Sequence, residues 1–209
     1  MMTTVYVVDD EADVRESLAW MLSGVGIEAL LFESAVAFLE AIDAEATGVA
    51  ILDINMPKMD GIELQAQLNQ RGCLLSVIFL TGYATVPKAV QALQAGAMDF
   101  LEKPVNGDQL LALIQQGLEL SGRRQQETLE VNQLAAKLTS LTERERELMM
   151  LVINGHTNKA IAAQLFIAQR TVEIHRKSLF DKMGVNNAAE LALLLGRHQA
   201  VGANHGQTK

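Results

Sequence analysis

The sequence predicts an α/β fold, a doubly wound sheet of five parallel strands, followed by a small all-α domain. Short apolar runs rich in β-branched residues alternate with helical patterns through the first half of the 209-residue chain. After Lys103 and Pro104 the pattern becomes wholly helical. Hydrophobic residues make up 49% of the chain, which is enough for well-packed cores.

Three apolar runs are the strongest strand candidates because they are short, β-branched and without strict alternation, as parallel strands buried on both faces are. The candidates are residues 5–8, 49–52 and 76–80, with weaker ones at 28–32 and 99–101. Helical patterns lie between them at residues 12–23, 34–42, 62–70 and 85–95. A ligand of such a sheet binds beyond the carboxyl ends of the strands, where we expect Asp9, Asp10, Asp53 and Thr81 to converge.

A helical connector is predicted to run from Asn106 to about Leu141, since apolar residues recur there at helical spacing. Gly117 and Gly122 can divide it into two helices. Its apolar stripe fits either a dimer seam or a helix packed on the preceding domain. The C-terminal part is predicted to form four short helices at residues 142–153, 157–164, 169–183 and 187–196.

Charge is distributed unevenly along a chain whose net charge is −8. Residues 1–120 hold 17 acidic and 5 basic side chains, whereas residues 141–209 hold 6 acidic and 9 basic ones. The acidic half suits a divalent cation, and the mildly basic half permits nucleic-acid binding without requiring it. The single cysteine, Cys73, excludes an internal disulfide. With no signal peptide and no apolar run near the ~20 residues that span a bilayer, we expect a cytoplasmic protein without a membrane span.

Two adjacent aspartates, Asp9 and Asp10, end the first strand candidate, and Asp53 ends another. Carboxylates a few ångströms apart resist joint ionisation unless a cation or a proton compensates their charge. The cluster therefore predicts that a cation or a proton belongs to the site.

The second and third helices of the C-terminal part are separated only by residues 165–168. Two helices joined by so short a turn, the second of them basic, are typical of a helix-turn-helix that places a recognition helix in the major groove. A generic helical bundle with a solvated basic face is the alternative. Thr142 and Glu145 form a capping-box pattern at the start of this region, and Gly155 suits a helix C-terminus.

Five sequence blocks in the first half resemble, in order, the receiver domain of two-component response regulators, a CheY-like domain with a flavodoxin-like sheet. The blocks are VVDD at 7–10, LDINMP at 52–57, MDG at 59–61, TG at 81–82 and DFLEKP at 99–104. The second half looks like a LuxR-type helix-turn-helix in the blocks LTERERE at 141–147, TNKAIA at 157–162 and TVEIHR at 171–176. Together they resemble the FixJ/NarL class of transcriptional regulators.

The resemblance implies that Asp53 accepts a phosphoryl group from a sensor histidine kinase, assisted by the hydroxyl of Thr81 and the ammonium of Lys103. A carboxylate at a strand end is chemically able to attack phosphorus and form an acyl phosphate. The resemblance also implies an Mg²⁺ cofactor held by Asp10, Asp53, the backbone carbonyl of Asn55 and, through a water molecule, Asp9. It makes Lys103-Pro104 a candidate cis peptide. A structural aspartate at 53 and a surface lysine at 103 are the alternatives.

By the same resemblance, Thr81 and Phe100 form a switch that senses the charge of the phosphoryl group. Movement of these two side chains is expected to alter residues 85–101 and to create a phosphorylation-dependent homodimer surface. An ordinary core aromatic is the alternative for Phe100.

The resemblance places Glu173, Ile174 and Lys177 at positions that face bases. Phosphate contacts and the remaining interface positions are expected at Asn158, Lys159, Arg170, Thr171, His175, Arg176 and Lys182. Val172 and Leu179 are expected in the core instead. A buried structural histidine is the alternative for His175.

The turn of the helix-turn-helix departs from the family pattern at two positions. Phe166 lacks the tolerance of glycine for positive φ, and Ala168 cannot cap the following helix with a side-chain oxygen. We therefore expect a strained or adjusted turn. The final helix, 188–195, is expected either to pair two copies of the chain or to close the small core.

We predict a phosphorylation-activated, DNA-binding transcription regulator whose dimerisation controls promoter binding. Its expected partners are a sensor histidine kinase, double-stranded promoter DNA, a second copy of the chain and RNA polymerase. The predicted domains are a receiver at 1–120, a helical linker at 121–140, the helix-turn-helix domain at 141–200 and a disordered tail at 201–209. The alternatives are a phosphorylation-independent regulator, which uses its receiver for protein contacts, and a phosphotransfer enzyme. No enzyme activity is expected beyond the receiver's own phosphorylation and dephosphorylation.

Overall fold

The computed structural model describes residues 4–82, 90, 91 and 93–204, with the side chains left out of the description from residue 197 onward. Contacts between residues divide the chain into two compact units, 1–126 and 127–209. Each unit has its own hydrophobic core. No helix among the described residues is long and apolar enough to cross a membrane.

The first unit is built on a sheet of five parallel strands in the order β2-β1-β3-β4-β5. The strands are β1 (Val5–Val8), β2 (Ala29–Phe32), β3 (Val49–Asp53), β4 (Ser76–Thr81) and β5 (Asp99–Glu102). Every residue of β1, β3 and β4 is buried, because helices cover both faces of these central strands. The predicted doubly wound fold class is confirmed.

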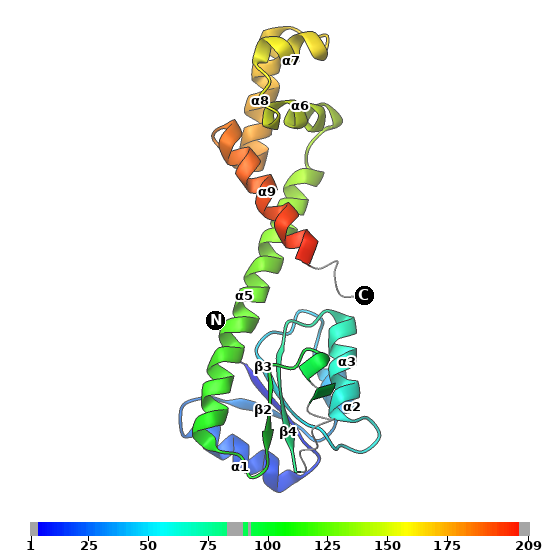
Figure 1. The fold of residues 1–209 in the computed structure, drawn as a ribbon, viewed down its shortest axis with the longest axis vertical. Coiled ribbons are helices and arrows are strands. Elements are labelled where there is room, and N and C mark those ends of the chain that lie inside the picture. Colours follow the sequence, from blue (N-terminus) through cyan, green and yellow to red (C-terminus); the bar gives the residue numbers. More distant parts are fainter. Residues whose placement is uncertain (1–3, 83–89, 92, 205–209) are drawn as a thin grey trace. The chain divides into compact units, whose positions relative to one another are not determined.

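Helices α1 (Ala12–Ser23), α2 (Ala35–Ala41) and α3 (Gly61–Arg71) lie between the strands, as predicted to within two residues at each end. Helices α2 and α3 cover one face of the sheet, and α1 and α5 cover the other (Figure 1). The predicted helix at 85–95 lies largely outside the described residues, and positions 90, 91, 93 and 94 of it are helical.

Helix α5 (Gly107–Thr139) is one continuous helix of 33 residues, so neither Gly117 nor Gly122 divides it. At Gly117 the reason is close packing: a Cβ atom there would lie 2.7 Å from Cγ2 of Val49 and 3.2 Å from Cβ of Ser76. The Ser76 hydroxyl donates to the Gly117 carbonyl over 2.8 Å. Glycine therefore lets the helix approach the sheet, and the continuing backbone hydrogen bonds outweigh its low helix propensity.

The second unit holds α6 (Glu143–Ile153), α7 (Asn158–Gln164), α8 (Gln169–Met183) and α9 (Ala188–Asn204). Its core includes Val172 and Leu179, both fully buried, as predicted. Helix α9 continues through residues 201–204, which the sequence analysis placed in the tail. The rest of the tail, 205–209, lies outside the described residues.

Candidate functional site

The carboxyl ends of β1 and β3 bring three aspartates together in the first unit. Asp9, Asp10 and Asp53 each offer a carboxylate oxygen, and these oxygens all lie within 4.8 Å of one another. Asp9 and Asp53 are buried, whereas Asp10 is exposed. The strands place the carboxylates here because the ends of adjacent parallel strands meet at one edge of the sheet.

Lys103, which follows β5, supplies an ammonium group to this cluster. Its Nζ lies 2.7 Å from Oδ2 of Asp9, 3.1 Å from Oδ1 of Asp53 and 3.3 Å from Oε1 of Glu11. The sequence predicted Asp9, Asp53 and Lys103 as one site, but it missed Glu11. The signal was present, since Glu11 directly follows the two aspartates.

Burial and neighbouring charges shift the pKa values of Asp53 and Lys103 in opposite directions. Burial raises the pKa of Asp53 above its usual value, and the neighbouring Lys103 ammonium only partly offsets this. Burial alone would lower the pKa of Lys103, but the short contact with the Asp9 carboxylate and the charge of Asp53 raise it. Because one ammonium faces several carboxylates, the site retains excess negative charge that a cation can neutralise.

The oxygen donors of the cluster fit Mg²⁺, which prefers carboxylate and carbonyl oxygens and keeps several waters. Oδ2 of Asp9 is buried and, within the described residues, accepts no hydrogen bond of good geometry, although it faces the Lys103 ammonium. The backbone N–H of Asn55 donates to Oδ2 of Asp53 over 2.9 Å and fixes the loop after β3. Asp9, Asp10 and Asp53 are therefore compatible with a divalent cation.

Strand β4 ends at Thr81, which is buried beside the end of β3. The Thr81 carbonyl accepts from the backbone N–H of Lys103 over 2.8 Å, so β4 and the lysine are held together. Phe100 in β5 is half-buried and packs against the core that α2 and α3 cover. The Lys103-Pro104 peptide is cis, as the resemblance implied.

The turn between α7 and α8 shows both predicted departures. Phe166 adopts a φ of 56°, in the left-handed region, and the residue is 94% exposed. Ala168 is the N-cap residue of α8 and makes no side-chain capping hydrogen bond. The turn therefore has a left-handed position at which glycine is the usual residue, and an N-cap position at which a residue with a polar side chain is usual.

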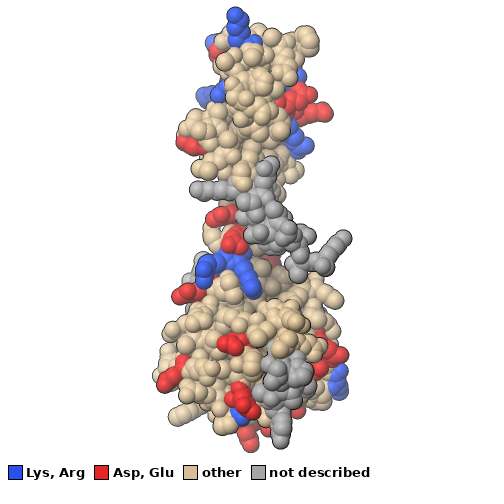
Figure 2. Space-filling view, in the orientation of Figure 1, with Lys and Arg blue, Asp and Glu red and all other residues tan. Residues whose placement is uncertain are grey.

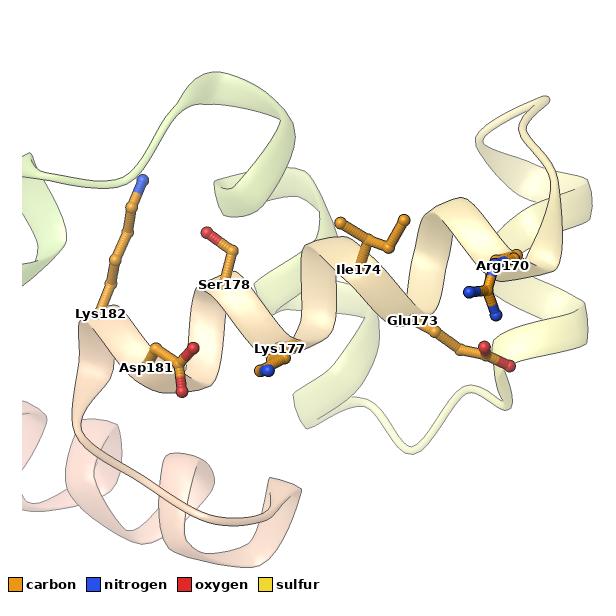
Figure 3. A pocket seen from close by; sticks show the side chains of 7 residues that line it. All are labelled: Arg170, Glu173, Ile174, Lys177, Ser178, Asp181 and Lys182. Carbon is orange, nitrogen blue, oxygen red and sulfur yellow. The ribbon is translucent and has the colours of Figure 1, made fainter.

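One face of α8 carries exposed side chains along an open pocket of about 480 Å³ (Figure 3). Arg170, Glu173, Ile174 and Lys177 are all exposed there, and Ile174 is 62% exposed. An exposed isoleucine between charged side chains supplies apolar and polar contacts on one helix face. This composition suits the edges of base pairs, which present methyl groups as well as donors and acceptors.

The two halves of the chain match two known protein families. Residues 5–115 match the response regulator receiver domain, and residues 139–195 match the luxR family of bacterial regulatory proteins. The first match alone covers more than half of the chain. The chain belongs to the response regulator family.

Relatives and solved structures of response regulators extend over nearly the whole chain. The transcriptional regulatory protein FixJ of Bradyrhizobium diazoefficiens is 37% identical over 199 residues, which cover 94% of this chain and 97% of that protein. The response regulator protein TmoT of Ectopseudomonas mendocina is 34% identical over 195 residues, or 93% of this chain and 89% of that one. The solved structure of the response regulator StyR is 40% identical, has a TM-score of 0.89, and the match covers 94% of this chain and 100% of that one.

This response regulator therefore joins a receiver domain to a LuxR-type DNA-binding domain, and it is a transcriptional regulator. On the face drawn in Figure 2, acidic side chains are scattered over the first unit, as the charge count of its sequence predicts.

Several predicted DNA-contact residues of the response regulator have partners within the second unit. Nη1 of Arg176 donates to Oδ1 of Asn158 over 3.0 Å, and its guanidinium lies 5.3 Å from the centroid of the Phe180 ring. Lys159 is exposed, whereas Thr171 and His175 are half-buried. Arg176 and Asn158 thus also connect α7 to α8.

Lys182 has a partner that the sequence did not reveal. Its Nζ lies 2.7 Å from Oε2 of Glu145, which is only 3% exposed, and also donates to the Ser140 carbonyl over 3.3 Å. Oε1 of Glu145 accepts from the Ser178 hydroxyl over 2.6 Å. The predicted capping box of Thr142 and Glu145 is confirmed, and its carboxylate in addition connects α6 to α8. No local pattern pairs positions so far apart in the sequence.

Proposed function

We propose that Asp53 accepts a phosphoryl group from a sensor histidine kinase and that this event controls DNA binding by the second unit. One observation carries the proposal: the buried Asp53 carboxylate lies 3.1 Å from the Lys103 ammonium, within a cluster of three aspartates. A buried carboxylate with an adjacent cation suits nucleophilic attack on phosphorus, because charge that develops on the transferred group is stabilised in place.

In the proposed step, one carboxylate oxygen of Asp53 attacks the phosphorus of the donor. A new P–O bond forms to Asp53, the bond from phosphorus to the leaving group breaks, and an acyl phosphate results. Lys103 donates to a phosphoryl oxygen, and Thr81 donates its hydroxyl to another. Hydrolysis of the acyl phosphate at the same site would end the signal, so the receiver acts only on its own phosphorylation state.

The proposed Mg²⁺ ligands are Asp10, Asp53, the backbone carbonyl of Asn55 and, through a water molecule, Asp9. When bound, the cation supplies positive charge that offsets the charge of the phosphoryl oxygens. The chain contributes the rest: burial keeps Asp9 and Asp53 in place, and the Asn55 N–H orients the Asp53 carboxylate.

Phosphorylation adds roughly −1.5 to −2 charges at the end of β3, and the proposed switch responds through Thr81 and Phe100. Movement of Thr81 toward the phosphoryl group would let Phe100, half-buried in β5, pack more deeply. We propose that residues 85–101 then form the homodimer surface and that α9 pairs the two DNA-binding domains. A shift of population toward the dimer would raise the affinity for paired half-sites.

For DNA, the proposed base-facing residues are Glu173, Ile174 and Lys177, supported by their exposure on α8. The proposed phosphate contacts and remaining interface residues are Asn158, Lys159, Arg170, Thr171, His175, Arg176 and Lys182. The domains proposed for this activity are residues 1–120, a linker at 121–140 and residues 141–200. RNA polymerase is the proposed downstream partner at the promoter.

Sequencing of genomic fragments captured by the full-length protein tests this function. Wild type treated with acetyl phosphate and Mg²⁺ is compared with Asp53→Asn treated identically. We expect wild type to enrich specific sites that Asp53→Asn does not enrich. Equal enrichment of the same sites by both proteins would contradict control by phosphorylation, and the lack of specific sites in both would contradict the DNA-binding role.

A further inference from the structure

Glu11 adds a third carboxylate to the Lys103 ammonium, beyond the set that the proposed phosphoryl transfer uses. Its Oε1 lies 3.3 Å from Nζ, whereas the Asp9 and Asp53 oxygens lie at 2.7 Å and 3.1 Å. An ammonium group has three N–H donors, and the Glu11 contact engages one of them with hydrogen-bond geometry, whereas Oδ2 of Asp9 accepts no hydrogen bond of good geometry. A phosphoryl oxygen that approaches Lys103 therefore competes with Glu11 for a donor.

Glu11 is the partner that is easiest to displace. Its side chain is 65% exposed, whereas the side chains of Asp9 and Asp53 are 1% and 5% exposed. An ion pair at an exposed site is weak, because water solvates the released carboxylate. The Glu11 backbone N–H donates to Oδ1 of Asp9 over 2.9 Å, so the backbone is held while the side chain can turn outward.

Helix capping does not explain the position of the Glu11 side chain. Glu11 is the N-cap residue of α1, yet its side chain makes no capping hydrogen bond. Replacing it with glutamine thus removes no cap and leaves the backbone hydrogen bond in place. The change removes one negative charge beside Lys103 and keeps nearly the same side-chain size.

We propose that Glu11 is a positioning residue that occupies the outward-facing donor of Lys103 and slows phosphorylation of Asp53, a regulation that rests on the proposed function of Asp53. The carboxylate competes with the incoming phosphoryl oxygen for the ammonium, and its charge repels anionic phosphodonors. With acetyl phosphate as donor, the bond from phosphorus to acetate breaks and a P–O bond to Asp53 forms. Lys103 transfers one hydrogen bond from Glu11 to a phosphoryl oxygen and stays protonated throughout.

The test compares full-length wild type, Glu11→Gln, Glu16→Gln and Asp53→Asn. Glu16 is an exposed residue of the same helix and is not among the ion-pair partners of Lys103, so Glu16→Gln controls for net charge. The second-order rate constant of phosphorylation by acetyl phosphate with Mg²⁺ is measured by phosphate-affinity electrophoresis at low and high ionic strength. Calorimetry of each protein with Mg²⁺ alone gives the affinity for the cation.

We expect Glu11→Gln to be phosphorylated about threefold to fivefold faster than wild type at low ionic strength, and Glu16→Gln at the wild-type rate. The difference should shrink at high salt, because screening weakens both competition and repulsion at an exposed site. The Mg²⁺ affinity of Glu11→Gln should stay within about twofold of wild type, since Glu11 acts through Lys103.

Three results would overturn the proposal. An unchanged rate in Glu11→Gln, with wild type phosphorylated and Asp53→Asn not, would reject the role of Glu11 and leave the proposed function intact. A loss of Mg²⁺ affinity of about tenfold would show that Glu11 is a cation ligand instead. Absence of any acyl phosphate in wild type would reject the function of Asp53 itself, and the regulation with it.

Discussion

The ammonium of Lys182 lies 2.7 Å from Oε2 of Glu145 and thereby joins the proposed recognition helix α8 to α6. Besides this ion pair, the carboxylate accepts hydrogen bonds from the Ser178 hydroxyl over 2.6 Å and the Thr142 backbone N–H over 2.8 Å. A buried carboxylate with this many donors is fully satisfied, so each partner becomes costly to remove. The orientation of α8 therefore depends on a polar cluster whose Ser178 and Lys182 also line the open pocket along this helix.

Replacing Glu145 with glutamine should destabilise the second unit by about 3 kcal/mol, because the change leaves the partly buried Lys182 ammonium without its counter-charge. The matched control is Glu147→Gln. Glu147 is 50% exposed and pairs with Arg144 one helical turn away, so its loss should cost less than about 0.5 kcal/mol. Hydrogen exchange of α6 and α8 amides in the full-length protein measures both effects. Similar exchange rates in the two variants would show that the Glu145 cluster contributes little to the stability of the second unit.

The same cluster gives the second unit a defined pH dependence. Burial alone would raise the pKa of Glu145, but hydrogen bonds from Lys182, Ser178 and Thr142 outweigh it and lower the pKa from 4.5 to about 2. Because the folded pKa lies below the unfolded one, this stabilisation is complete above about pH 4.5 and is lost as the pH falls toward 2.

Between about pH 5 and pH 2, the free energy of unfolding should thus fall more for wild type than for Glu145→Gln, by on the order of 3 kcal/mol. Urea unfolding at a series of pH values, followed by circular dichroism, gives the comparison. Parallel pH profiles for the two proteins would be inconsistent with a depressed pKa at Glu145.

Two glycines of α5 should respond to alanine in opposite directions. A Cβ at Gly117 would lie 2.7 Å from Val49, so Gly117→Ala should destabilise the receiver by about 1–3 kcal/mol through overpacking. A Cβ at Gly122 would have no atom within 4 Å, so Gly122→Ala should stabilise the helix by up to about 1 kcal/mol. Thermal unfolding of both variants measures the difference. Stabilisation by Gly117→Ala would contradict the close approach of α5 to β3.

Phe166 should be replaceable by glycine with a gain in stability. Its φ of 56° costs an ordinary residue on the order of 1 kcal/mol, and its side chain is almost fully exposed, so little packing is lost. We expect Phe166→Gly to raise the free energy of unfolding of the second unit by about 0.5–1 kcal/mol. Phe166→Ala is the control, since it removes the ring but keeps a Cβ at positive φ. If Phe166→Ala raised the free energy of unfolding as much as Phe166→Gly, the gain would come from removal of the ring and not from relief of backbone strain.

The sequence predicted those parts of the fold that short-range patterns determine. Buried parallel strands appear as continuous apolar runs, so the sequence alone predicts where β1 and β3 end and thereby places Asp9 and Asp53 at the site. The strained turn at Phe166 was predictable for the same reason, because a turn depends on its own few residues. The structure shows where these residues lie. The roles that the resemblance implies for them stay predictions.

Features that depend on distant parts of the chain were missed. Gly117 alone predicts a break in α5, because the sequence does not show how closely the helix approaches Val49 of the sheet. Glu145 was assigned only a capping role, since its partner Lys182 is on another helix. Glu11 was missed although it adjoins Asp10, because its contact with Lys103 depends on how β5 lies beside the site.

The most direct test of the central claim is to locate the acyl phosphate after full-length protein is treated with acetyl phosphate and Mg²⁺. Borohydride reduction followed by mass spectrometry of peptides identifies the modified residue. We predict modification at Asp53 in wild type, its loss in Asp53→Asn, and its loss in wild type when a chelator removes the divalent cation. Modification at another residue, or undiminished modification of Asp53→Asn, would contradict the assignment of Asp53 as the phosphoryl acceptor.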